Sequence, residues 1–226
     1  MSYILHIDST TKICSIGLSK DDALIQLVEL DSDGLAHSEK LHLFIEECLG
    51  KVSIRASDLN AISVSKGPGS YTGLRIGVSA AKGLCYGLNI PLIAVDTLTA
   101  MANSVVHNVE KGAVLIPMID ARRIEVFCSI HHKGKEIKTV HSRVLDEEPF
   151  DELHSENVYY FGDGAEKAQD YLNSSWIYLP EPKTSAKNLI PLAWRKFINK
   201  DFEDVAYFEP SYHKDFLAGK PKKILK

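Results

Sequence analysis

Hydrophobic positions in the first half of the chain predict strands that are followed by alternating helices and strands. Apolar and β-branched runs between polar turns are typical of strands, whereas apolar residues three and four apart are typical of a helix with one buried face. The strand-like runs are residues 3–7, 13–18, 24–30, 62–65 and 92–95, and the helix-like segments are residues 37–49, 72–86 and 97–106. The first half is therefore predicted to run βββαβαβα.

The second half begins a similar pattern again. Its strand-like runs are residues 114–119, 124–130, 138–144 and 158–161, and its helix-like segments are residues 166–172 and 186–198. Successive strands again precede alternating strands and helices, without readable sequence identity between the halves. We therefore interpret the chain as an α/β protein of two similar lobes, residues 1–110 and 111–226. A single mixed sheet is the alternative that this pattern leaves open.

The overall composition is that of an ordinary globular protein. Hydrophobic residues make up 45% of the chain and charged residues 25%, and the formal net charge of −4 offers no basic surface for RNA as a whole. No apolar run approaches the length of about 18 residues that a membrane span needs. The one basic stretch is residues 214–226, whose five lysines we interpret as a solvated tail rather than an RNA-binding arm.

The cysteines and the first residues indicate where the chain works. The four cysteines are Cys14, Cys48, Cys85 and Cys128, and none of them belongs to a C-x-x-C pair. Because each has apolar neighbours, we predict buried thiols in a reducing compartment and not a zinc site or a disulfide. The first strand begins without a basic leader, so we expect no signal peptide and a cytoplasmic location.

The turn at 67–73 lies between a strand and a helix, where free backbone N–H groups and the helix dipole favour phosphate binding. Its spacing fits no standard motif. Thr72 stands where the dinucleotide fingerprint needs a glycine, and the P-loop spacing reaches only Thr72 or Leu74. A nucleophile elbow around Ser70 would need glycines where the chain has Pro68 and Thr72. The turn is therefore not assigned to any of these three kinds of site.

The helix after this turn contains Gly73, Gly77 and Gly83. A glycine in a helix interior costs about 1 kcal/mol relative to alanine, so these positions indicate that another backbone comes close. That backbone belongs either to the same chain or to a partner subunit, and the residues alone favour neither.

Residues 66–77, KGPGSYTGLRIG, resemble the signature G-P-G-S-[FY]-T-G-[LV]-R-I-G of the TsaB (YeaZ) family. The residues of this signature loop are Gly67, Pro68, Gly69, Ser70, Tyr71, Thr72 and Arg75. Shorter matches occur at residues 7–10, 36–38, 94–98, 119–122, 161–165 and 210–212, so the resemblance spans the chain. The tail departs from the family pattern, because His213 and Lys214 follow Tyr212 where leucine or valine and then arginine are common.

The resemblance implies both a fold and a role. Members of the family are similar to actin, Hsp70 and sugar kinases, with two lobes that each contain a mixed five-stranded sheet flanked by helices. They take part in making threonylcarbamoyladenosine beside the tRNA anticodon, where a TsaD-type subunit transfers the threonylcarbamoyl group. TsaB binds TsaD, and a TsaE-type ATPase joins them. We therefore expect a non-catalytic partner and activator of TsaD, which meets tRNA only within the complex.

Two departures from related proteins bear on cofactors. TsaD-type subunits carry a metal-binding H-x-x-x-H where this chain has Thr97 and Met101, which are poor metal ligands. Actin-like folds usually place a glycine in the first hairpin near the phosphates, whereas Asp8, Ser9 and Thr10 offer an acid and hydroxyls without one. We expect these three residues to be nucleotide-proximal, but no nucleotide or metal to be held tightly by this chain alone. ATP and a metal ion are expected on the partner subunits.

The leading hypothesis is that the helices at 37–49 and 72–87 present a small-residue, apolar face to TsaD, or to a second copy of this chain when it is alone. The residues predicted for this face are Leu41, Phe44, Ile45, Cys48, Gly73, Leu74, Ile76, Gly77, Ala80, Ala81 and Leu84. The competing hypotheses are an actin-fold ATPase that acts on its own and a peptidase, which lacks a recognisable nucleophile–base pair. A direct tRNA-binding module is disfavoured by the acidic net charge.

Overall fold

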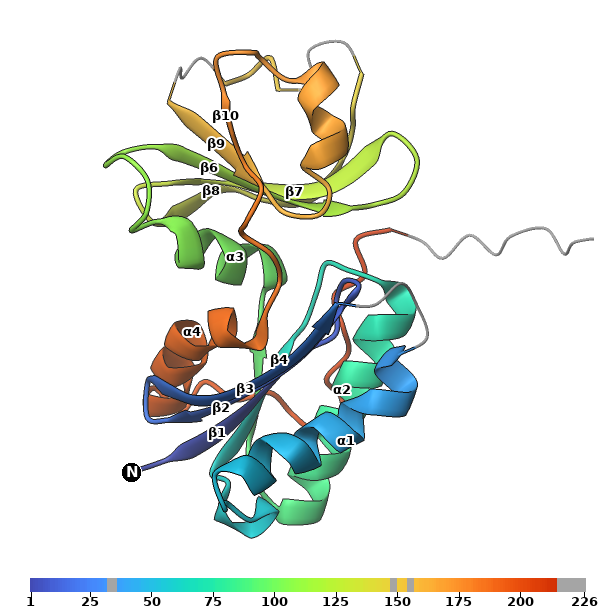
Figure 1. Cartoon of the computed structure of the whole chain (residues 1–226), viewed down its shortest axis with the longest axis vertical. Helices are drawn as coiled ribbons and strands as arrows, with labels where there is room; N and C mark the ends of the chain where they lie inside the picture. Colours follow the sequence, from blue (N-terminus) through green and yellow to red (C-terminus); the bar gives the residue numbers. More distant parts are fainter. Residues whose placement is uncertain (32–35, 147–149, 154–156, 215–226) are drawn as a thin grey trace, which may run out of the picture.

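The computed structural model of the chain describes residues 1–31, 36–146, 150–153 and 157–214. Two five-stranded mixed sheets form two lobes, which lie one above the other in Figure 1. The two-lobe prediction is confirmed, and the alternative of a single mixed sheet is wrong. Within the described residues, no helix is both long enough and apolar enough to cross a membrane.

The sheet of the first lobe combines an antiparallel meander with a parallel extension. Its strands are β1 (Tyr3–Asp8), β2 (Ile13–Lys20), β3 (Ala23–Asp31), β4 (Ala61–Ser65) and β5 (Leu92–Val95), in the order β3-β2-β1-β4-β5. β1, β2 and β3 pair antiparallel, whereas β4 pairs parallel with both β1 and β5. The tight polar turns predicted between the first three strands account for the meander, since antiparallel neighbours need only a short connection.

The sheet of the second lobe repeats this topology. Its strands are β6 (Val114–Asp120), β7 (Glu125–His132), β8 (Lys135–Val144), β9 (Val158–Phe161) and β10 (Ile177–Leu179), and β8-β7-β6-β9-β10 is the same order as in the first lobe. The pattern did not predict β10, because three residues are too few to show a period. The predicted helix over 166–172 is a 3₁₀ helix, Glu166–Tyr171, which buries only Ala168.

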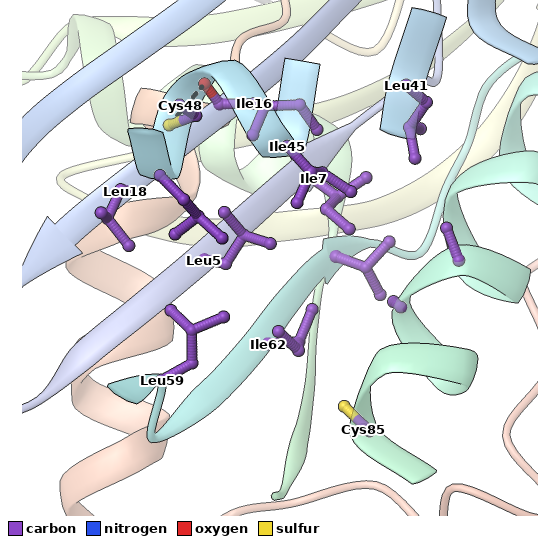
Figure 2. Close-up of a cluster of buried hydrophobic side chains, with 14 of the residues drawn as sticks. Leu5, Ile7, Ile16, Leu18, Leu41, Ile45, Cys48, Leu59, Ile62 and Cys85 are labelled. Carbon is purple, nitrogen blue, oxygen red and sulfur yellow. Dashed lines mark hydrogen bonds between the residues drawn. The ribbon is translucent and has the colours of Figure 1, made fainter. Parts of the chain in front are cut away.

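Two long helices cover one face of the first sheet. They are α1 (Ala36–Lys51) and α2 (Tyr71–Leu88), and the short 3₁₀ helix Ala56–Asp58 leads into β4. Figure 2 shows how Leu41, Ile45 and Cys48 of α1 and Cys85 of α2 gather over Leu5 and other apolar side chains of the sheet. The four cysteines are buried, as predicted.

The last helix of each half crosses to the other lobe. Helix α3 (Thr97–Val105) follows β5, yet Leu98 and Met101 pack with Leu115 and Phe127 of the second sheet. Helix α4 (Ala186–Ile198) follows β10, yet it packs with apolar residues of the first sheet, among them Ile4. Figure 1 shows α3 beneath the upper sheet and α4 beside the lower one. A boundary near residue 110 therefore separates the two sheets but not the helices that cover them.

The face of the first sheet under α4 contains a buried histidine. His6 of β1 is fully buried, and its Nε2 lies 2.9 Å from Ser19 Oγ. Burial lowers the pKa of His6 to about 3, because the charged imidazolium would lose its hydration. His6 is therefore neutral in the folded protein, whereas in the unfolded chain it takes up a proton near its ordinary pKa of about 6.5.

We predict that this difference makes the fold less stable in acid. The folded-state pKa is depressed, so the free energy of unfolding falls as the pH drops from about 6.5 toward about 3, at up to about 1.4 kcal/mol per pH unit. Urea unfolding at pH 7.5 and pH 5.0 should show a smaller loss for His6→Gln than for the wild type. The control is His107→Gln, since His107 is exposed. An unchanged loss in His6→Gln would contradict the assignment.

Candidate functional site

The signature loop joins β4 to α2 and is anchored at both ends. The Thr97 N–H, at the start of α3, donates a hydrogen bond to the Gly67 carbonyl at 3.0 Å. At the other end Ser70 caps α2, because its hydroxyl accepts a hydrogen bond from the Gly73 N–H at 3.3 Å. The loop is thus held between the start of α3 and the start of α2.

Three glycines let this loop and helix lie directly on the turn between β1 and β2. A Cβ at any of them would lie closer than 3.0 Å to that turn. Gly69 would meet the Thr10 carbonyl, and Gly73 and Gly77 would meet the carbonyl and the hydroxyl of Ser9. The neighbour that these glycines admit is therefore the chain's own hairpin and not a partner subunit.

Hydrogen bonds complete the contact between the loop and the turn. The Ser70 N–H donates to the Thr10 carbonyl at 2.7 Å, and the Ser9 hydroxyl donates to the Gly73 carbonyl at 2.8 Å. The Thr10 N–H and hydroxyl both donate to Asp8 Oδ1, at 3.1 and 2.7 Å. The polar groups of the β1–β2 turn are thus used within the fold.

The three nucleotide-proximal candidates, Asp8, Ser9 and Thr10, lie together beneath this loop and are each at most 2% exposed. Burial raises the pKa of the Asp8 carboxyl, and the hydrogen bonds from Thr10 act in the opposite direction. The structure brings these residues together as the sequence indicated, but their side chains face the interior.

The predicted interface residues divide into buried and outward-facing positions. Those that are buried in the lobe are Leu41, Ile45, Cys48, Gly73, Leu74, Gly77, Ala80 and Ala81, and those that are only partly buried are Phe44, Ile76 and Leu84. The buried set was predicted to face a partner, and for these residues the structure shows the opposite. The apolar stripe of each amphipathic helix packs on its own sheet, as is usual for helices that cover a sheet.

The outward face of α1 and α2 combines three of the predicted residues, Ile76, Ala80 and Leu84, with residues that were not predicted. Leu43 of α1 is 59% exposed and Tyr86 of α2 is 87% exposed. A groove of about 320 Å³ separates the two helices and is lined by His42, Ile76, Ser79, Ala80, Gly83 and Leu84. A Cβ at Gly83 would meet no atom within 4 Å, so the fold of this chain does not explain that glycine. Exposed apolar side chains and an open groove on the same pair of helices are typical of a protein-binding surface.

The start of α3 holds the positions that correspond to the metal-binding histidines of TsaD-type proteins. Thr97 and Met101 are each 1% exposed, and Met101 packs into the core of the second lobe. Asp96 caps α3 by accepting a hydrogen bond from the Thr99 N–H at 2.9 Å. Within the described part of the chain, no group of three or more His, Cys, Asp or Glu side chains is placed to hold a metal ion.

Arg75 of the signature loop contacts a residue whose role the sequence did not reveal. Its guanidinium lies 4.1 Å from the ring centre of Tyr71 and 6.0 Å from that of Tyr212. Its Nε donates a hydrogen bond to the Tyr212 hydroxyl at 3.2 Å. Tyr212 belongs to the late P-S-Y match to the family, which was the only sequence signal for this contact.

Comparisons with known proteins identify the family to which the sequence is similar. The family model described as TsaD, tRNA N6-adenosine threonylcarbamoyltransferase, matches residues 34–223. The chain is 29% identical to a tRNA threonylcarbamoyladenosine biosynthesis protein TsaB from Escherichia coli, over 96% of each chain. It is 35% identical to a Bacillus subtilis protein of the same description, over 57% of this chain and 54% of the relative.

A solved structure shows the same fold. It comes from Pseudomonas aeruginosa and is described as similar to peptidase YeaZ; it is 23% identical, has a TM-score of 0.79, and covers 95% of this chain and 100% of its own. The predicted fold of two lobes that each hold a mixed five-stranded sheet is confirmed. Since the family model covers well over half of the chain and relatives called TsaB match it along most of its length, the chain belongs to the TsaB (YeaZ) family.

Proposed function

We propose that this chain takes part in the synthesis of threonylcarbamoyladenosine on tRNA, as a non-catalytic partner and activator of a TsaD-type subunit. The descriptions of its relatives support the pathway. The observation that supports the partner role is the outward face of α1 and α2, defined by Leu43, Tyr86 and the groove between the helices. This face exposes Leu43 and Tyr86 among polar and charged residues, while the inner face of the same helices already fills the core.

The non-catalytic part of the proposal is supported by side-chain chemistry. Thr97 and Met101 are poor metal ligands and are buried in the fold. Asp8, Ser9 and Thr10 are buried beneath the signature loop, and their polar groups are bound within the chain. We therefore propose that this chain alone binds no nucleotide or metal tightly, and that the partner subunits carry the ATP and the metal ion.

Charge supports helix-to-helix docking. Helix α1 carries Glu39, Glu46 and Glu47 against Lys40 and Lys51, a net charge of −1. Helix α2 carries Arg75 and Lys82 and no acidic residue, a net charge of +2. A two-fold arrangement that places α1 of one copy against α2 of the other would bring helices of opposite net charge together, which would favour a homodimer when the chain is alone. The TsaD-type subunit would use the same face, so the two assemblies should compete.

The remaining partners follow from this arrangement. A TsaE-type ATPase would join the pair, and tRNA would be met only within the complex, since the net charge of this chain is −4. The reaction requires access to tRNA, so we propose that the chain works in the cytoplasm.

The first prediction from the proposed function concerns the outward face of α1 and α2. Leu43→Glu combined with Tyr86→Glu should abolish co-purification with a TsaD-type subunit and shift the isolated chain to a monomer, because two charges would replace exposed apolar side chains. Size-exclusion chromatography and pull-down measure both effects. Ile137→Glu is the matched control, since Ile137 is 58% exposed on β8 of the other lobe. Unimpaired binding by a folded double variant would remove this face from the interface.

Substitutions of buried helix residues are unsuitable for that test. Gly77→Leu would place a side chain against Ser9, and Ala81→Glu would bury a carboxylate, because Ala81 is 0% exposed. Both variants are expected to unfold the first lobe and not to report on partner binding.

The second prediction concerns the reaction. Reconstitution with the TsaD-type and TsaE-type subunits and the enzyme that makes the threonylcarbamoyl donor should modify tRNA only when this chain is present. The Leu43→Glu, Tyr86→Glu double variant should behave like omission, whereas Ile137→Glu should restore modification. Full modification without the chain, measured by mass spectrometry of tRNA nucleosides, would refute an activating role.

The third prediction concerns nucleotide. Isothermal titration of the purified chain with ATP and Mg²⁺ should show no tight site, because the β1–β2 turn lies against the signature loop. A site of sub-micromolar affinity would favour the competing hypothesis of an ATPase that acts on its own.

A further inference from the structure

The segment after α4, residues 203–214, runs along the first lobe before it reaches the second. It begins at the sheet edge, where the Glu203 N–H donates to the Leu92 carbonyl at 2.9 Å. It then lies beside α2, where Lys82 Nζ donates to the carbonyls of Ala206 and Phe208 at 3.2 and 2.8 Å. Phe208 also packs against the core of the first lobe. The first half of this segment is thus fixed to the first lobe by backbone, side-chain and apolar contacts.

The signature loop holds the next part of the segment. The Ser211 N–H donates to the Lys66 carbonyl at 2.8 Å. A Cβ at Gly67 would lie 2.6 Å from the Ser211 carbonyl, and Gly67 has a φ of +121°, so only glycine fits this position without strain. The ring of Tyr212 lies 5.0 Å from that of Tyr71, next to the Arg75 guanidinium. A tilted contact between aromatic rings beside a guanidinium stabilises this exposed junction without burying it.

The last described residues of the segment contact the second lobe. The ring of His213 lies 6.4 Å from that of Phe127, on β7. Lys214 forms an ion pair with Glu125, the first residue of β7. The segment thus spans from α2 to the second sheet. In Figure 1 it lies on the right of the molecule, whereas α3 and α4, through which the lobes also meet, lie toward the left.

We propose that residues 203–214 are a clamp that fixes the angle between the two lobes, with Arg75 and Tyr212 as the residues that position it. The lobes meet at the α3–α4 contact, and rotation about such a contact is a common motion of two-lobed proteins. The clamp is a second contact between the lobes, on the other side of the molecule, and it opposes that rotation. The clamp assigns a role to the late P-S-Y match to the family, which the partner and nucleotide proposals leave unused, and to the contact that Arg75 makes with it.

The test measures the distance between the lobes by pulsed electron paramagnetic resonance on the full-length chain. Spin labels are attached at Asp22→Cys in the first lobe and Asp170→Cys in the second, both of which are exposed, while the native cysteines are buried. Tyr212→Ala and Arg75→Ala should each widen the distance distribution. Tyr212→Phe should keep the distance distribution narrow, because the contact between the aromatic rings at positions 71 and 212 remains. Tyr207→Ala is the matched control, since Tyr207 is 84% exposed and lies in the same segment.

Hydrogen exchange gives a second measurement on the same variants. The Ser211 amide should exchange at least about fivefold faster in Tyr212→Ala than in Tyr207→Ala, because the hydrogen bond to Lys66 opens more often. If Tyr212→Ala does not fold, Lys214→Ala decides the question, since it removes the ion pair with the second lobe and leaves the contacts with the first lobe intact, and it should also widen the distribution. A distribution as narrow as the wild type in a folded Tyr212→Ala or Lys214→Ala variant would overturn the clamp.

Discussion

The close contact between the signature loop and the β1–β2 turn is the interaction on which the first lobe depends. Gly69, Gly73 and Gly77 let α2 begin directly on the backbone of that turn, and the hydrogen bonds of Ser9 and Ser70 fix the distance. Helix α2 in turn sets the space beneath it, into which the side chains of the sheet and of α1 pack (Figure 2). A side chain at Gly73 would move the helix away from the sheet and open that core, because protein interiors tolerate little change in packing. A motif that first resembles a phosphate loop is therefore explained by packing.

The two lobes are joined by exchanged helices as well as by the connecting chain. Each half of the chain contributes its final helix to the other half, α3 to the second sheet and α4 to the first. The segment at residues 203–214 then returns along α2 and reaches β7. Because these contacts join residues far apart in the sequence, neither half holds all the elements that cover its own sheet. The lobes therefore meet both at the α3–α4 contact and through residues 203–214, the segment that we propose to fix the angle between them.

Because many side chains of the first lobe are engaged within the fold, only part of its surface is free to bind a partner. The inner faces of α1 and α2 are used by the core, and the polar groups of Asp8, Ser9 and Thr10 are used by the turn. The surface of α1 and α2 that remains exposed is the outward face, which includes Leu43 and Tyr86. A protein whose polar turn is closed and whose helices expose apolar side chains is suited to bind another protein more than to bind a nucleotide. The proposed role as an activating subunit follows from that distribution.

The sequence by itself determined the family and most of the elements, and it favoured their repetition in two lobes without excluding a single mixed sheet. Local periodicity and the long signature at 66–77 were sufficient for these, because both are properties of neighbouring residues. It also placed Asp8, Ser9 and Thr10 at one turn. It did not determine which side of α2 faces solvent, because small residues such as Gly77 and Ala81 can pack against a sheet or against a partner. In the structure Gly77 lies against Ser9 of the same chain, so this side of α2 faces the sheet. The exchange of α3 and α4 and the contact between Arg75 and Tyr212 were likewise decided by tertiary structure, because they join residues that are distant in the chain and carry no local pattern.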